Sequence, residues 1–238
     1  MIKNIPIFDL IYPRRCPICQ EIIPYGAGNL ACDTCRQRIP YIRGNRCMKC
    51  GKPVESEDVE YCFDCASDEK HYEKGYPLML YTKGVKQGVL AMKYHNRREY
   101  AEFYSREMLK EFAGEWKAIR FDGIVPVPVH RHRRRVRGYN QAELLAYPIG
   151  KALEVRVYNK LLIRTTDTKP QKDLNDKERL KNIKNAFIIG QNKVELNKVL
   201  LIDDIYTSGA TIEACTNALH RGGVGQVYYT SICIGKGY

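Results

Sequence analysis

The chain has 238 residues, with 39 Lys and Arg against 27 Asp and Glu, and 44% of its residues are hydrophobic. This composition is ordinary for a globular protein and excludes collagen-like, low-complexity and wholly disordered chains. No run approaches the roughly 20 apolar residues that a transmembrane helix needs, so we expect no membrane insertion.

The N-terminal apolar stretch, residues 5–12, is shorter than we expect for a signal peptide, and two arginines follow it where a small-residue cleavage site would lie. We therefore expect a cytoplasmic protein. In that reducing setting its cysteines should be metal ligands or thiols rather than disulfides.

Eight of the ten cysteines form four C-x-x-C pairs in the first part of the chain. They are Cys16, Cys19, Cys32, Cys35, Cys47, Cys50, Cys62 and Cys65. Structural zinc takes four tetrahedral ligands, so eight cysteines predict two zinc sites that hold a small domain together. Nearly equal spacing leaves the pairing open between a sequential and a crossed arrangement, and the residues around each pair favour the sequential one. Cys215 and Cys233 lie in apolar contexts and are predicted to be buried hydrophobic residues.

The end of this cysteine cluster and the charge distribution both indicate a domain boundary near residue 70. Residues 1–71 carry ten basic and ten acidic side chains, whereas residues 72–238 carry 29 and 17. We predict a double zinc ribbon at 1–70 and a second domain at 71–238. Two tetrathiolate zinc centres of about −2 each would bring the formal +12 to about +8, and the first domain to about −4.

The second domain alternates short β-type runs with segments of helical period. The predicted strands cover residues 77–82, 123–129, 161–164, 199–202 and 227–234. The predicted helices cover residues 98–116, 140–153 and 211–219. This alternation predicts an α/β fold with a mostly parallel sheet flanked by helices.

A run of arginines follows the second predicted strand, and it consists of Arg131, Arg133, Arg134, Arg135 and Arg137. We expect a loop here, which either is solvated or binds phosphate oxygens with its planar guanidinium groups. Its position after a strand favours phosphate binding.

Residues 199–211 combine a buried strand, Asp203 and Asp204, a loop of small residues and the start of a helix. The loop and first helical turn would offer amides and hydroxyls to a phosphate, and they consist of Thr207, Ser208, Gly209, Ala210 and Thr211. The carboxylates would lie at the strand end, where open α/β sheets bind ligands. No G-x-x-x-x-G-K-[ST] motif is present, which excludes a P-loop nucleotide hydrolase.

Residues 199–211 resemble the phosphoribosyl pyrophosphate (PRPP) signature of type I phosphoribosyltransferases. By that resemblance Asp203 and Asp204 would hold the ribose hydroxyls, the loop would hold the 5′-phosphate, and magnesium would accompany PRPP. The P-V-P-V and R-x-R-G-Y-N-Q-A segments of 126–142, the L-L-I-R-T segment at 161–165 and the cysteine pairs are similar to the ComF family of competence proteins. That family joins a double zinc ribbon to a phosphoribosyltransferase-like domain.

The ComF resemblance covers nearly the whole chain and implicates further ligand-binding residues. They are Arg137, Gly138, Asn140 and Gln141 in one loop, and Arg164, Thr168, Gln171, Arg179 and Asn182 in a second. The second loop either forms a flap over the site or is a plain surface loop, and the sequence leaves both alternatives open.

The ComF resemblance implies a protein that binds PRPP or a related phosphorylated ligand and handles single-stranded DNA during uptake, with a helicase-like partner at the ribbon. Basic residues beside Tyr94 and Tyr139 are typical of single-strand binding, although either tyrosine also suits a half-buried position. The alternative is an active phosphoribosyltransferase of nucleotide salvage, with Mg²⁺ and cationic side chains stabilising the leaving pyrophosphate.

Overall fold

The computed structural model describes residues 12–26, 28–165, 186–190 and 195–235. Four residues that the ComF resemblance implicates lie outside these ranges, and they are Thr168, Gln171, Arg179 and Asn182. Within the described ranges, no helix has the length and apolarity required to cross a bilayer.

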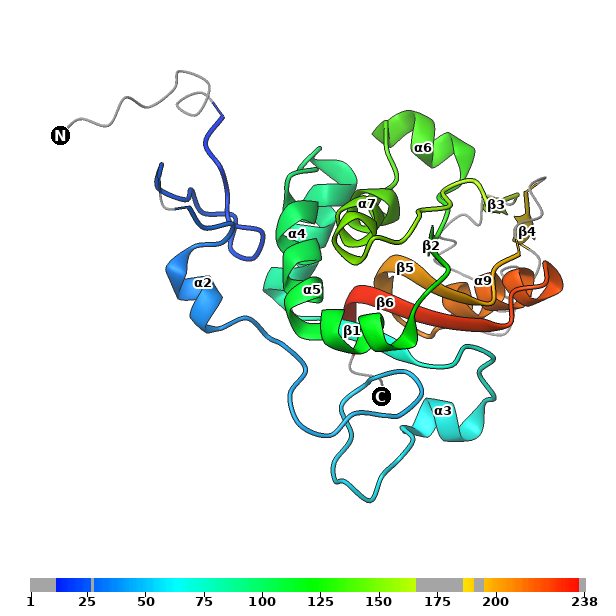
Figure 1. The fold of residues 1–238 in the computed structure, drawn as a ribbon. Helices are drawn as coiled ribbons and strands as arrows, with labels where there is room; N and C mark the ends of the chain where they lie inside the picture. The colour runs from blue at the N-terminus through cyan, green and yellow to red at the C-terminus, as the bar shows by residue number, and fades with distance from the viewer. Residues whose placement is uncertain (1–11, 27, 166–185, 191–194, 236–238) are drawn as a thin grey trace, which may run out of the picture.

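A four-stranded sheet forms the centre of the molecule (Figure 1). Its strands are β1 (Gly75–Leu80), β6 (Gln226–Ile234), β5 (Lys198–Tyr206) and β2 (Gly123–Pro126), in that spatial order. All three pairings are parallel, as the alternation of strands and helices predicts. Parallel pairing brings the carboxyl ends of β2 and β5 to the same edge, where Pro126 is in register with Ile202.

Two further strands form a separate antiparallel pair, β3 (Leu162–Arg164) with β4 (Phe187–Ile189). The sequence predicts the first of these strands but places it in the parallel sheet. Antiparallel pairing with β4, which the sequence pattern does not reveal, takes it out of that sheet.

Helices cover both faces of the main sheet (Figure 1). On one face lie α4 (Lys83–Tyr94), α5 (Tyr100–Ile119) and α7 (Gln141–Leu153), and on the other lies α9 (Ala210–Arg221). Side chains of β5 alternate between the two resulting cores, with Leu200 and Ile202 in one and Val199 and Leu201 in the other. The continuous apolar run is therefore buried on both sides, as expected for an inner parallel strand.

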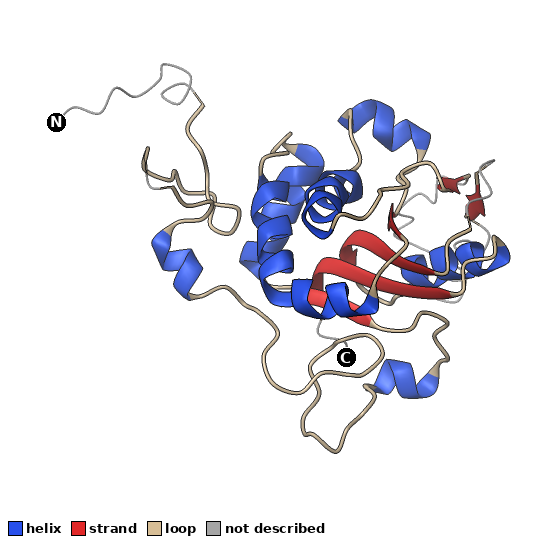
Figure 2. Cartoon of the chain, in the orientation of Figure 1, coloured by secondary structure: helices blue, strands red, loops and turns tan. Residues whose placement is uncertain are grey.

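The cysteine-rich segment is mostly loop and contains two short helices, α2 (Asp33–Gln37) and α3 (Phe63–Ser67) (Figure 2). Its first half packs on the α4 and α5 side, where Cys16 and Ile23 join the core. Its second half packs on the opposite side, where Cys50 and Tyr72 join the other core. The two halves thus contact opposite layers of the α/β body.

Candidate phosphate-binding site and zinc centres

The eight clustered cysteines form two separate groups of four. The first contains Cys16, Cys19, Cys32 and Cys35, and the second contains Cys47, Cys50, Cys62 and Cys65. Sulfur atoms within each group lie within 4.8 Å of one another. The sequential arrangement that the local residues favour is therefore confirmed.

Both groups fit structural zinc. Four thiolates around an ion at about 2.3 Å give sulfur separations of about 3.8 Å. The Sγ atoms of Cys19 and Cys32 lie 3.7 Å apart, and those of Cys50 and Cys62 lie 3.5 Å apart. Four cysteines complete the tetrahedron, so these sites support two structural zinc ions. Cys215 and Cys233 are fully buried outside these groups, as predicted.

The two adjacent carboxylates lie in the last part of β5, which extends beyond the predicted strand to Tyr206. Asp203 accepts a hydrogen bond of 2.8 Å from the backbone N–H of Asp204. Burial raises the pKa of Asp203 to about 7, the charge of Asp204 acts in the same direction, and the positive charges of Lys93 and Arg164 act against it. The two carboxylates thus disfavour each other's charge, and the nearby cations favour their ionised forms.

Lys93, at the end of α4, provides the direct cationic contact to this pair. Its Nζ donates a hydrogen bond of 2.8 Å to Asp204, and both side chains are largely buried. Burial would lower the pKa of Lys93, but the charge and hydrogen bond of Asp204 outweigh it and raise the pKa. Sequence reasoning missed this role, because 111 residues separate the two side chains and no local signal joins them.

Residues 207–209, which the sequence predicts to bind phosphate and which we call the phosphate loop, connect β5 to α9. Thr207 and Ser208 are exposed, and the helix begins at Ala210 with Gly209 as its N-cap. Gly209 has φ +80°, and a Cβ atom there would lie 2.2 Å from the Tyr206 hydroxyl oxygen. No side chain caps this helix among the described residues, so its first amides are positioned to bind an anion.

The arginine run forms a helix, α6 (Arg131–Arg137), and the expectation of a loop is wrong. The His130 side chain accepts a hydrogen bond from the His132 N–H at the start, and Gly138 with φ +78° ends the helix. Arginine is a good helix former, so the N-cap at His130 and the glycine C-cap at Gly138 suffice to define a short helix here.

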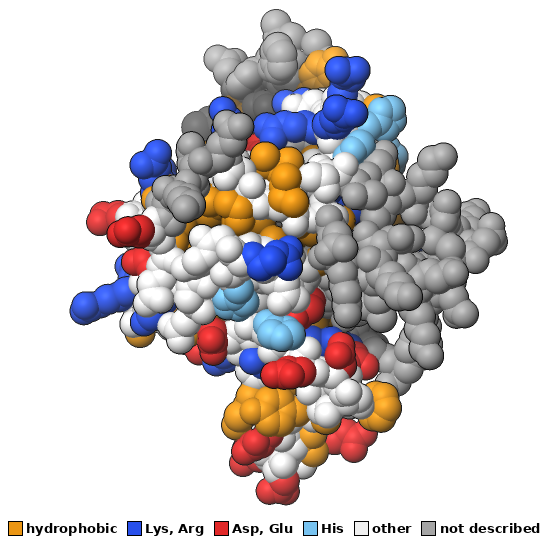
Figure 3. All heavy atoms as spheres, turned by 90° about the vertical axis from the view of Figure 1, so that its right-hand side faces the viewer, with side chains coloured by type: hydrophobic (Ala, Val, Ile, Leu, Met, Phe, Trp, Pro, Cys, Tyr) orange, Lys and Arg blue, Asp and Glu red, His pale blue; other side chains and the backbone are white. Residues whose placement is uncertain are grey.

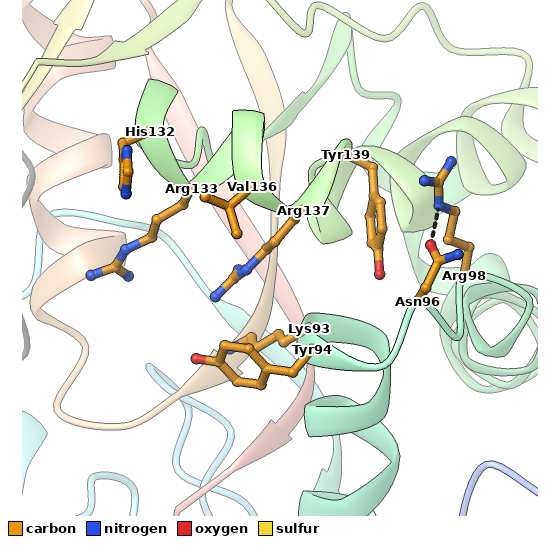
Figure 4. Close-up of a pocket in the computed structure, with 9 residues that line it drawn as sticks. All are labelled: Lys93, Tyr94, Asn96, Arg98, His132, Arg133, Val136, Arg137 and Tyr139. Carbon is orange, nitrogen blue, oxygen red and sulfur yellow. Dashed lines mark hydrogen bonds between the residues drawn. The ribbon is translucent and has the colours of Figure 1, made fainter.

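Helical spacing divides the arginines between two faces. Arg133, Val136 and Arg137 line a pocket of about 580 Å³ together with Lys93 and Tyr94 of α4 (Figure 4). Arg131 and Arg135 line a second hollow with His130 and His132. Lys93 lines the larger pocket and also contacts Asp204, so that pocket adjoins the acidic pair.

Arg134 has a structural contact instead. It makes two hydrogen bonds, 2.8 and 3.1 Å long, to the carboxylate of Glu143 in α7. This ion pair fixes α6 against the following helix.

Three other predicted residues lie where α6 meets α7. Asn140 caps α7 by accepting from the Ala142 N–H, and its amide donates to the Val127 carbonyl oxygen. Gln141 accepts a hydrogen bond of 3.1 Å from Arg137, and its buried amide nitrogen has no hydrogen-bond partner among the described residues. Asn140 thus positions the loop, while Arg137 and Gln141 lie together beside the pocket.

The two candidate stacking tyrosines differ. Tyr139 also lines the pocket, but it is only 7% exposed and its hydroxyl donates to the Met92 carbonyl oxygen, so it is not an accessible platform. Tyr94 is 66% exposed, and the Arg137 guanidinium carbon lies 5.0 Å from its ring centroid. Tyr94 alone of the two is available to stack on a base. The parallel sheet, the acidic strand end and the phosphate loop are consistent with a phosphoribosyltransferase-like fold.

Comparison with known proteins places this architecture among related sequences. Residues 7–66 match the Double zinc ribbon domain family. The chain is 26% identical to Competence protein F of Haemophilus influenzae over 76% of this chain and 81% of that protein. It is 26% identical to DNA utilization protein YhgH of Escherichia coli K12, over 94% of this chain and 98% of that protein. It is 27% identical to Competence protein ComFC of Bacillus subtilis, over 76% of this chain and 74% of that protein. The resemblance stated from the sequence is confirmed, and the chain is a homologue of the ComF and YhgH competence and DNA-utilization proteins.

Proposed function

We propose that this protein binds PRPP or a closely related phosphorylated ligand in the cytoplasm and handles single-stranded DNA during uptake. The double zinc ribbon would cover residues 1–70 and the ligand-binding domain residues 71–238. One observation supports the ligand most strongly. Asp203 and Asp204 lie near the end of β5, and the short loop that follows them ends at Gly209, the N-cap of α9, a helix without a side-chain cap.

In this proposal each group has a separate part in binding. Asp203 and Asp204 hold the ribose hydroxyls, and residues 207–211 hold the 5′-phosphate with amides and hydroxyls. Arg137 faces the pocket beside Lys93 and would bind the pyrophosphate oxygens. Gln171 and Arg179, outside the described residues, remain predicted contacts. Magnesium bound with PRPP would neutralise the pyrophosphate charge.

Isothermal titration calorimetry tests the ligand. The wild-type protein should bind PRPP in a Mg²⁺-dependent manner, and Asp203→Asn/Asp204→Asn should lose that binding. Asp33→Asn, an exposed carboxylate of the first ribbon, is the matched control and should bind normally. Equal affinity in all three proteins would disprove the site.

The DNA part of the proposal rests on the outward face of α6 and on Tyr94. Arg131 and Arg135 are exposed, and Tyr94 offers an aromatic face near the adjoining pocket. Arginine binds phosphates while an aromatic ring stacks on bases, which together suit a single strand without sequence preference.

Arg131→Ala/Arg135→Ala should therefore weaken single-strand binding and flatten its dependence on salt. Loss of two phosphate contacts should reduce the slope of log affinity against log salt by about 1.4. Arg36→Ala/Arg106→Ala removes two exposed arginines elsewhere and should leave the slope unchanged. An unchanged slope in the α6 variant would disprove this contact.

The second candidate function is phosphoribosyl transfer in nucleotide salvage. The pocket beside the acidic pair favours it, because about 580 Å³ accommodates a small acceptor. Pyrophosphate release from PRPP with a panel of nucleobases tests this alternative, and release only in the presence of one acceptor would establish it.

A helicase-like partner of the uptake machinery would bind at the zinc ribbon. The distribution of charge over the ribbon indicates which part of it the partner would contact.

A further inference from the structure

The two zinc ribbons carry opposite charges, although the segment as a whole is neutral. Residues 12–46 contain six arginines and two acidic residues, whereas residues 47–70 contain three lysines and seven acidic residues. Each tetrathiolate zinc centre adds about −2. The second ribbon is therefore strongly acidic, while the first is basic.

Exposed apolar side chains accompany the acidic charge on the second ribbon. Phe63 is 80% exposed, Met48 55%, Tyr61 45% and Val59 39%. We call these four residues, with the exposed acidic residues among 55–69, the acidic ribbon face. Figure 3 shows hydrophobic and acidic side chains together at the lower end of the molecule, where the second ribbon lies in Figure 1.

The cysteine group links the two turns that carry the most exposed apolar side chains of this face. Met48 lies between the ligands Cys47 and Cys50, and Phe63 lies between Cys62 and Cys65. The backbone N–H of Met48 also donates a hydrogen bond of 2.8 Å to the Glu60 carbonyl oxygen, which joins the two turns. A zinc ion held by these cysteines would fix the backbone that carries Met48 and Phe63 before any partner arrives, which would reduce the entropic cost of association.

Most of the carboxylates on this face are available. Asp64 pairs with Lys52 and Asp68 pairs with Lys70. The other five acidic residues are exposed and make no ion pair with any described residue, and they are Glu55, Glu57, Asp58, Glu60 and Glu69. Exposed aromatic and methionine side chains within a charged rim are typical of a protein interface.

We infer that the acidic ribbon face binds a basic segment of another protein, with apolar side chains that contact Phe63 and Tyr61. Charge complementarity selects this partner, because acidic side chains attract lysine and arginine and repel nucleic acid. The inference deepens the proposed partner contact of the ribbon and rests on that part of the proposed function.

A second copy of this chain fits less well. Its densest basic segment is α6, where Arg134 already pairs with Glu143 and Arg137 lines the ligand pocket. A contact between the ribbon of one copy and α6 of the next would be head-to-tail, and such contacts extend into filaments unless a ring closes.

Site-specific photo-cross-linking tests the inference in the cells that produce the protein. Phe63→p-benzoylphenylalanine in the full chain should cross-link to another protein, at a segment in which Lys and Arg outnumber Asp and Glu and apolar side chains recur. Tyr25→p-benzoylphenylalanine, on the first ribbon and 45% exposed, is the control and should not cross-link there.

The cross-linked segment, made as a peptide, should then bind the zinc-loaded full chain. Phe63→Ala should weaken that binding at least about tenfold, and Tyr25→Ala should not. Glu57→Gln/Asp58→Asn/Glu60→Gln should flatten its salt dependence. These variants should still contain two zinc ions per chain and bind PRPP and DNA as the wild type does. Such a result would distinguish a failure of this inference from a failure of the proposed ligand site.

Three results would overturn the inference. They are equal cross-linking from positions 25 and 63, cross-links to an acidic segment or to a second copy of this chain, and peptide binding that Phe63→Ala leaves unchanged.

Discussion

The hydroxyl of Tyr229 donates a hydrogen bond of 2.8 Å to the carbonyl oxygen of Cys50, a ligand of the second zinc centre. The ring of Tyr229 stacks on that of Tyr206, with centroids 4.9 Å apart and planes 10° apart. The Tyr206 hydroxyl is in turn 2.9 Å from that of Tyr72 and lies against Gly209. Buried side chains thus connect the second zinc centre to the phosphate loop.

Loss of this connection should weaken both stability and ligand binding. Tyr229→Phe leaves the Cys50 carbonyl without its partner, and we expect the free energy of unfolding to fall by about 1–3 kcal/mol. Because Tyr229 supports Tyr206, the affinity for PRPP should fall as well. Urea denaturation and calorimetry measure the two effects.

Tyr104→Phe is the matched control for that variant. The Tyr104 hydroxyl donates to the Pro17 carbonyl oxygen of the first ribbon, at 3.2 Å. We expect a similar loss of stability with no loss of PRPP affinity. Equal affinity in both variants would disprove the connection.

Gly209→Ala should abolish phosphate binding. The new Cβ atom would lie 2.2 Å from the Tyr206 hydroxyl oxygen, and the residue would keep a φ of +80° that only glycine adopts readily. Gly223→Ala, at φ +93° with open space around it, carries the backbone strain without the clash. Calorimetry should show loss of PRPP binding in the first variant alone. Retained binding in Gly209→Ala would contradict the assignment of the loop.

The stability of the ligand-free protein should depend on the titration of Asp203. Its pKa is raised to about 7 by burial first and by the charge of Asp204 second, so the folded state binds this proton more tightly than the unfolded chain does. The stability that the proton provides is fully present below about pH 4 and is lost as the pH rises through about 7.

Asp203→Asn removes that loss. Relative to the wild type, the variant should become increasingly stable as the pH rises from about 5 to about 8, by about 1.4 kcal/mol for each unit of the pKa shift that is titrated. Urea denaturation in magnesium-free buffer at several pH values measures this difference. A difference that does not change with pH would show that Asp203 titrates normally.

Lys93→Met should destabilise the protein most at high pH. Lys93 is the described cation in direct contact with Asp204, and its removal takes from the two neighbouring carboxylates their ion pair and leaves only more distant positive charge. Protonation relieves the repulsion, so the fall in melting temperature should shrink as the pH is lowered.

Lys74→Met is the control for the loss of a lysine ion pair. Lys74 pairs with Glu115 at the surface, where both side chains are more than 40% exposed, and its replacement should have little effect at any pH. Equal behaviour of the two variants would rule out a special role for Lys93.

Sequence reasoning predicted the features that depend on local chemistry. The cysteine pairs determined two metal sites, and the apolar run before Asp203 determined an inner strand that ends in acidic residues. Each of these signals lies within a few residues, where spacing and residue type decide the structure. The helix that begins at Ala210 belongs to the same class.

Contacts over long sequence distances could not be predicted in this way. Nothing near Lys93 indicates a carboxylate partner, and nothing near Cys50 indicates Tyr229. The arginine run was misassigned for a local reason, because its charge suggests solvent while its helix depends on caps at His130 and Gly138. Tyr139 beside that run is buried, and its hydroxyl donates to the Met92 carbonyl oxygen of α4, a partner 47 residues away.

The ion pair between Arg134 and Glu143 has a consequence for the speed of recognition. A flexible cationic loop must find its bound conformation after it meets a phosphate ligand. In contrast, two hydrogen bonds to Glu143 of α7 hold α6 in place before the encounter. The remaining arginines then present a fixed positive field, which guides anions by diffusion and requires little rearrangement on arrival. The association rate constant should therefore be high at low salt and should fall steeply as added salt screens that field.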